Sequence, residues 1–117
     1  MLRIAICDDD QAFLSLTVSV IGQWKNKPLD LILETFDNGD SLILSHNETP
    51  FDIVFLDPPF HKGIIDTILT PLIFHLKPGA YVYLETEHGV KLPEKWETLR
   101  EQTTRQVQYR LIQYKGS

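Results

Sequence analysis

The chain has 117 residues and a formal net charge of −5, from eleven basic and sixteen acidic side chains. This length suits one small domain with its own core, because independent domains usually run about 50–200 residues. The net charge argues against a whole-domain electrostatic grip on nucleic acid, which requires a basic face. The single cysteine, Cys7, excludes an internal disulfide and a cysteine-based zinc site, and its apolar neighbours predict a buried core residue.

The charge is unevenly distributed along the chain. Residues 1–57 carry three basic and ten acidic side chains, a net −7, whereas residues 58–117 carry eight and six, a net +2. The N-terminus lacks a signal-peptide pattern, and no apolar run approaches the ~18 residues of a membrane span. We therefore expect a soluble, cytoplasmic protein with no membrane partner.

The first half of the chain alternates strand and helix patterns. Residues 2–7 predict a buried strand, and Asp10 is a natural N-cap for the helix that follows. Alternation over residues 29–36 predicts a second strand, Asp40 is expected to cap a short helix over 41–46, and residues 51–56 predict a third strand that ends at Asp57. The apolar positions of the first helix recur at helical spacing and predict one face packed on the sheet: Phe13, Leu16, Thr17, Val20, Ile21 and Trp24.

The second half continues with one more helix and three strands. The third helix contains Pro71, which predicts a kink or a break. Pro78-Gly79 predicts a turn before a strand over 80–86; residues 96–103 and 107–114 alternate and predict an antiparallel hairpin, although 94–102 could instead begin as a helix. The predicted buried stripe of the third helix consists of Ile65, Ile68, Leu69, Leu72 and Leu76.

This element order predicts an α/β fold, with a doubly wound, mainly parallel sheet between two helix layers, a three-layer αβα arrangement. The terminal hairpin adds an antiparallel edge. In such folds the ligand crevice lies at the carboxyl ends of the central strands. Two acidic sites fall at that edge: Asp8-Asp9-Asp10 after the first strand and Asp57 after the third.

Two segments of the first half resemble a response-regulator receiver domain of the LytTR/AgrA-like branch: Ile4-Ala5-Ile6-Cys7-Asp8-Asp9-Asp10 and Phe51-Asp52-Ile53-Val54-Phe55-Leu56-Asp57. The resemblance implies a flavodoxin-like fold in which Asp8 and Asp9 bind Mg²⁺ and Asp57 is both a metal ligand and the phosphoacceptor. Pro59 lacks the N–H that would help hold a phosphoryl group, so metal binding is favoured over phosphorylation. The alternative interpretation is a helix N-cap and a solvated strand end.

Residues 54–63, 81–87 and 106–114 resemble the RsmD-type methyltransferases of small-subunit ribosomal RNA, Rossmann-like enzymes that modify a guanine exocyclic amine. The shared motif is Asp57-Pro58-Pro59-Phe60. The resemblance implies that Asp57 and the Pro58 carbonyl accept hydrogen bonds from the target amine and that Phe60 stacks on the flipped base. It also implies the strand order 2-1-3-4-6-5 with the last strand antiparallel. The alternative interpretation of the motif is a rigid strand-to-helix turn.

The loop after the first strand lacks the glycines over which such enzymes hold S-adenosylmethionine, so we expect that cofactor site to be absent. Glu34 could stand in for a ribose-binding acid. The leading hypothesis is an engineered, recombinant chimera: a single hybrid domain over 1–117, with a receiver-like half (1–57) and a methyltransferase-like half (58–117) and no evolved activity.

The alternatives are residual Mg²⁺ or phosphate binding at Asp8, Asp9 and Asp57, and a residual S-adenosylmethionine-dependent RNA guanine methyltransferase. No partner is required by the leading hypothesis, nucleic acid is an unlikely one, and the chain is expected to be a monomer or an edge-paired dimer. The basic side chains between 91 and 110 are interleaved with glutamates and predict a mixed solvated face.

Overall fold

The computed structural model describes residues 2–24, 30–44, 50–60 and 65–116, without the side chains at positions 39, 40, 57–60 and 66. Strands and helices follow one another as β1 (Arg3–Cys7), α1 (Gln11–Gly22), β2 (Ile32–Phe36), α2 (Gly39–Ile43), β3 (Phe51–Phe60), α3 (Ile65–Leu72), the 3-10 turn η1 (Ile73–His75), β4 (Leu76–Thr86), β5 (Trp96–Thr103) and β6 (Gln108–Tyr114).

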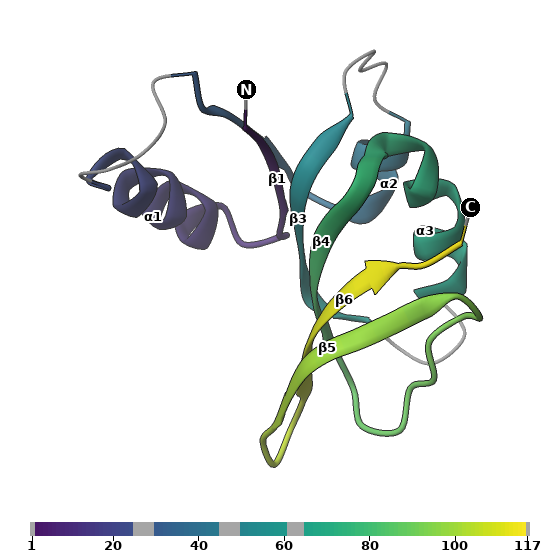
Figure 1. The fold of residues 1–117 in the computed structure, drawn as a ribbon. Coiled ribbons are helices and arrows are strands. Elements are labelled where there is room, and N and C mark those ends of the chain that lie inside the picture. Colours follow the sequence, from purple (N-terminus) through teal and green to yellow (C-terminus); the bar gives the residue numbers. More distant parts are fainter. Residues whose placement is uncertain (1, 25–29, 45–49, 61–64, 117) are drawn as a thin grey trace.

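One sheet joins all six strands in the order β2-β1-β3-β4-β6-β5. The first four are parallel to their neighbours, and β6 and β5 run antiparallel. Helix α1 lies on one face of the sheet, and α2 and α3 lie on the other (Figure 1). The predicted three-layer fold and its strand order are confirmed. Every residue of β1 is buried, as expected for a strand covered on both faces.

The main core lies between the sheet and α3. Leu56, Leu84 and Ile112, on β3, β4 and β6, are fully buried there. Four of the five predicted apolar positions of α3 are buried, and the fifth, Leu76, instead begins β4. Pro71 lies inside α3, which passes into η1 after Leu72. The break follows from proline, because its ring removes an N–H and clashes with the preceding turn.

Helix α1 does not pack as the apolar spacing predicts. Leu14 is its buried residue, whereas Phe13, Leu16 and Val20 are 44%, 61% and 59% exposed. Trp24, beyond the helix, is 46% exposed. The prediction holds only in part: Ile21 packs against the sheet, whereas Leu16 and Val20 do not, because α1 carries apolar residues on several sides. Because α1 packs only partly on the sheet, a space remains between the helix and the sheet.

The C-terminal hairpin is a pair of strands, so the alternative helix over 94–102 is excluded for Trp96–Thr103. Strand β4 begins earlier than predicted and contains Pro78 and Gly79. Its register with β3 shifts between the Phe51–Leu76 and Ile53–Tyr81 pairs, so the two residues form a bulge in the strand. Gly79 has a φ of 78°, a conformation that favours glycine.

Strand β2 begins at Ile32, and the predicted residues 25–29 and 45–49 lie outside the described ranges. At the start of α2 the side-chain oxygen of Asn38 accepts a hydrogen bond from the Ser41 N–H at 2.7 Å. Asn38 therefore does the capping that the sequence assigned to Asp40. Within the described ranges, none of the helices has the length and hydrophobicity that crossing a bilayer requires.

Candidate functional site

The carboxyl ends of β1, β3 and β4 meet at one edge of the sheet. Cys7 pairs in register with Leu56, and Leu56 pairs with Leu84. The next residues along the first two strands are Asp8 and Asp57, so the backbone brings these positions to neighbouring strand ends, as the parallel order predicts. This edge is the candidate functional site.

The loop Asp8-Asp9-Asp10 is tied to the fold by its own hydrogen bonds. Asp8 is 4% exposed; its N–H donates to the Phe36 carbonyl at 3.0 Å, and its carboxylate accepts from the Asp10 N–H at 2.9 Å. The carboxylate of Asp10 caps α1 by accepting from two backbone N–H groups, of Ala12 and Phe13. The predicted N-cap is confirmed, and Asp9 and Asp10 are both exposed.

The predicted Mg²⁺ ligands Asp8, Asp9 and Asp57 are only partly described. Among the side chains that the structure describes, no group of three His, Cys, Asp or Glu residues is arranged to hold a metal. The carboxylate of Asp57 lies outside that set. The assignment of these residues as metal ligands therefore depends on the receiver resemblance alone.

The motif Asp57-Pro58-Pro59-Phe60 forms the last part of β3. Its register with β4 is irregular: Leu56 pairs with Leu84 and Phe60 with Thr86, so four steps along β3 match two along β4. Prolines cannot donate to a ladder, and an interrupted ladder bulges. The backbone of the motif is therefore displaced at the edge of the sheet. Its side chains are not described, and their catalytic roles remain a prediction.

A cavity of about 490 Å³ opens between α1 and the sheet beside this edge. Three of its aromatic rings form a row across β3, β4 and β6: the Phe55 and Tyr83 rings lie 5.9 Å apart, and Tyr83 stacks on Tyr109 at 6.1 Å. From their alternation the tyrosines were predicted to be packing residues, and the register of β4 with β6 places Tyr83 against Tyr109. The cavity is lined by Ile6, Phe13, Thr17, Ile21, Phe55, Leu56, Tyr83, Glu85 and Tyr109.

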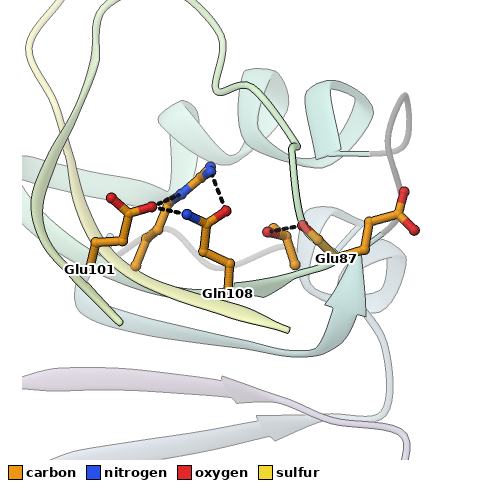
Figure 2. A network of polar contacts seen from close by, with 5 residues as sticks. Glu87, Glu101 and Gln108 are labelled. Atoms are coloured by element: carbon orange, nitrogen blue, oxygen red, sulfur yellow. Dashed lines mark hydrogen bonds and ion pairs between the residues drawn. The ribbon is translucent and has the colours of Figure 1, made fainter. Parts of the chain in front are cut away.

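A polar network lies where the end of β4 meets the start of β6 (Figure 2). The Arg110 guanidinium lies 3.6 Å from the Glu101 carboxylate and donates to the Gln108 side-chain oxygen at 2.7 Å. The Gln108 amide nitrogen donates to Glu101. The Arg110 side chain is only 11% exposed, so its predicted place on a solvated face is wrong. Only the pairing of β5 with β6 brings these three residues together.

Other ionisable groups of the sheet have structural roles. Glu34, the candidate ribose-binding acid, pairs with the buried Arg3, whose guanidinium lies 5.0 Å from the centre of the Phe51 ring. Burial would raise the pKa of Asp52, but hydrogen bonds from Lys77 at 2.8 Å and the Arg3 N–H at 2.9 Å hold it below its usual value. Cys7 is fully buried, as predicted, and burial raises its thiol pKa to about 12.

Comparison with curated proteins finds relatives with one shared name, Ribosomal RNA small subunit methyltransferase D. The chain is 45% identical to the Haemophilus influenzae protein over 78 residues, which cover 63% of this chain and 40% of that protein. It is 37% identical to the Escherichia coli K12 protein over 75 residues, covering 60% and 38%. The chain thus spans about 40% of the length of these relatives.

Solved structures agree in fold. The candidate methylase HI0767 of Haemophilus influenzae aligns with a TM-score of 0.63 and 29% identity, over 97% of this chain and 73% of that chain. The candidate methyltransferase yhhF of Escherichia coli aligns with a TM-score of 0.65 over 99% of this chain and 78% of that one; at 22% identity this likeness concerns the fold alone.

A family model matches residues 9–113 and runs through position 57 without a break. The predicted receiver half, the engineered chimera and its recombinant origin are therefore wrong. The error has a physical reason: receiver and methyltransferase sheets share the β-α-β order and place acids at the same edge, so a short α/β segment does not distinguish them. The chain belongs to the family described as Conserved hypothetical protein 95.

Proposed function

We propose that this protein transfers a methyl group to the exocyclic amine of a guanine in small-subunit ribosomal RNA. The observation that carries the proposal is the Asp57-Pro58-Pro59-Phe60 motif in a bulge at the carboxyl end of β3, in a chain whose relatives are named small-subunit ribosomal RNA methyltransferases. The sequence-based view that the chain has no evolved activity and that nucleic acid is an unlikely partner is overturned by these relatives.

The proposed roles follow from the groups that the motif offers. The Asp57 carboxylate and the Pro58 carbonyl accept the two N–H hydrogens of the target amine, which orients the nitrogen for attack. The Phe60 ring stacks on the base once it has left its helix. Asp57 is also the acceptor for the proton that the amine loses. The bulge supports these roles because it sets this stretch of backbone apart from the regular ladder.

The methyl donor proposed is S-adenosylmethionine, and the sequence-based expectation that its site is absent is overturned by the methyltransferase relatives. When bound, this cofactor supplies a methyl group on a positively charged sulfur. The residues at the edge fit such a group: carboxylates suit a cation, and the apolar cavity beside α1 suits a planar ring. The exposed Asp37, directly after β2, is a better acceptor for ribose hydroxyls than Glu34, which pairs with Arg3.

The acidic net charge does not oppose this function. A methyltransferase that takes one base out of its stack needs local contacts at that base. The sign of the whole-domain charge therefore does not decide whether the protein binds RNA. Residues 58–117, with their net +2, begin inside the target-base motif, at Pro58. Ribosomal RNA is made in the bacterial cytoplasm, which is the location that the proposal implies.

Methyl transfer to unmodified small-subunit ribosomal RNA tests the proposal. The protein is incubated with the RNA and isotopically labelled S-adenosylmethionine, and the digested nucleosides are identified by mass spectrometry. We expect labelled N2-methylguanosine, and a rate lowered roughly 100-fold or more by Asp57→Ala. Glu97→Ala, an exposed acid on β5, is the matched control and should leave the rate unchanged.

Two outcomes contradict the proposal. One is the absence of methylated guanosine with naked RNA, with ribonucleoprotein particles and with the intact subunit alike. The other is an Asp57→Ala variant that folds, as judged by circular dichroism, and retains the wild-type rate.

A further inference from the structure

The network of Glu101, Gln108 and Arg110 fixes the orientation of one amide. A carboxylate can only accept and a guanidinium can only donate hydrogen bonds. The Gln108 oxygen must therefore face Arg110, and its nitrogen must face Glu101, as the contacts have it. A surface glutamine usually turns freely. This one is held by two charged neighbours, one of which, Arg110, is only 11% exposed.

The held amide keeps half of its hydrogen-bonding capacity. A primary amide has two N–H donors and two acceptor positions on its oxygen. Among the contacts of the described residues, Gln108 uses one N–H on Glu101 and one acceptor position on Arg110. One donor and one acceptor position thus remain, on an amide that the network prevents from reversing.

The strand register places Gln108 in line with the target-base motif. Phe60 pairs with Thr86 on β4, and Thr86 pairs with Gln108 on β6. Two strand spacings, roughly 10 Å, separate the first and last of these positions. A base stacked near Phe60 therefore has its neighbour in the RNA chain within reach of Gln108. Figure 2 shows the Gln108 side chain on this end of the sheet, with Glu101 beside it.

We propose that Gln108 binds the base edge of an unpaired nucleotide adjacent to the target guanine, with Glu101 and Arg110 as positioning residues. This inference rests on the proposed function and adds to it a second point of RNA contact. Each of the four bases presents a donor beside an acceptor on its Watson–Crick edge, the pattern that an amide complements. In a duplex those edges are occupied. The contact therefore selects for an unpaired neighbour.

A double-mutant cycle tests the inference: it combines a change of the Gln108 side chain with a change of one nucleotide, and compares the effects on binding. A fluorescent RNA hairpin carries the target guanine in its loop, and matched RNAs replace one flanking nucleotide, on either side, with an abasic ribose. Anisotropy gives the Kd of each RNA for the wild type and for Gln108→Leu. For one of the two neighbours, we expect the abasic change to weaken wild-type binding about tenfold, and to leave Gln108→Leu binding unaltered.

Matched variants distinguish loss of the contact with the base from loss of folding. Gln113→Leu removes a glutamine from the other end of β6, where its side chain bonds the Gly79 carbonyl, and should keep the full abasic effect. Gln108→Asn retains the amide but shortens its reach, so it should lose the effect even if the leucine variant fails to fold. Arg110→Lys, which still donates to the Gln108 oxygen, should preserve the abasic effect that Arg110→Met loses.

The inference is wrong if the abasic changes weaken the wild type and both Gln108 variants by the same factor, or if neither neighbour matters to the wild type. Methylation of each RNA is measured in parallel. If methyl transfer persists but Gln108 and the neighbouring nucleotide are not coupled in binding, this inference alone is overturned. If the wild type neither binds nor methylates the RNA, the proposed function is overturned as well.

Discussion

Replacing Glu34 with glutamine should destabilise the protein without touching its candidate site. Glu34 neutralises Arg3, whose side chain is 8% exposed and lies over the Phe51 ring. Glu34→Gln keeps the shape of the side chain but removes the negative charge that pairs with the buried guanidinium. The experiment therefore measures what this ion pair contributes to the fold.

The magnitude follows from the burial of the two partners. Removing one member of a fully buried pair costs about 3–5 kcal/mol, and breaking an exposed pair costs about 0.2–1 kcal/mol. Arg3 is buried, whereas Glu34 is 28% exposed, which places this pair between the two limits. The stacking of Arg3 on Phe51 persists in the variant and offsets part of the loss. We expect the free energy of unfolding to fall by about 2 kcal/mol.

Urea unfolding followed by tryptophan fluorescence measures this change. With a slope of about 1.5 kcal/mol/M, a loss of about 2 kcal/mol lowers the midpoint by roughly 1 M. The variants Arg3→Met and Arg3→Met/Glu34→Gln complete a double-mutant cycle. We expect the double variant to be more stable than the sum of the single changes predicts, because it removes both charges of the pair together.

Two results would refute this reasoning. A Glu34→Gln midpoint within about 0.2 M of the wild type would mean that water already neutralises Arg3. Additive single effects would mean that the two charges do not interact. A large loss of S-adenosylmethionine affinity in a Glu34→Gln protein that stays fully folded would instead restore Glu34 as a ribose-binding acid.

Three further predictions concern the core and the effect of pH. Leu84→Ala should lower the free energy of unfolding by about 3 kcal/mol, whereas Leu99→Ala, at a position 38% exposed, should cost under about 0.5 kcal/mol in the same urea titration. The lowered pKa of Asp52 means that its ionised form stabilises the fold above pH ~4, and that this contribution is lost as the pH falls through the lower folded-state value. Asp52→Asn should therefore flatten the acid dependence of the midpoint, and an unchanged slope would contradict the assignment. The Cys7 thiol, buried and with a pKa of about 12, should react with a disulfide reagent at neutral pH only after unfolding; rapid reaction of the native protein would contradict its burial.

The helices show where sequence periodicity is sufficient and where it is not. In α3 the apolar positions form a single stripe, and Ile65, Ile68, Leu69 and Leu72 are all buried. In α1 the apolar residues lie on several sides, and the predicted face is mostly exposed. A periodic pattern predicts which face is buried only when the helix has a single apolar face, because its packing on the sheet otherwise depends on the neighbouring elements.

In the candidate site, too, some features were predictable from the sequence and others were not. The position of Asp8 and Asp57 at neighbouring strand ends follows from the order of elements, since parallel strands place their carboxyl ends at one edge. The acid cap of α1 at Asp10 is equally local. The assignment of residues 1–57 to a receiver domain failed, however, because two fold families place the same residue types at that edge, and only the continuous match over residues 9–113 separates them.

By itself, the sequence determined the α/β class and the acidic edge of the sheet, because each depends on local pattern or on the order of elements along the chain. The strand order and the role of the target-base motif came from the resemblance to a methyltransferase family. Only the tertiary structure decided which residues surround these features. Pairing of β6 with β4 and β5 brings Tyr109 onto Tyr83 and joins Gln108 to Glu101, contacts between residues that no periodicity relates. Such contacts depend on strand register, which packing of the whole sheet sets.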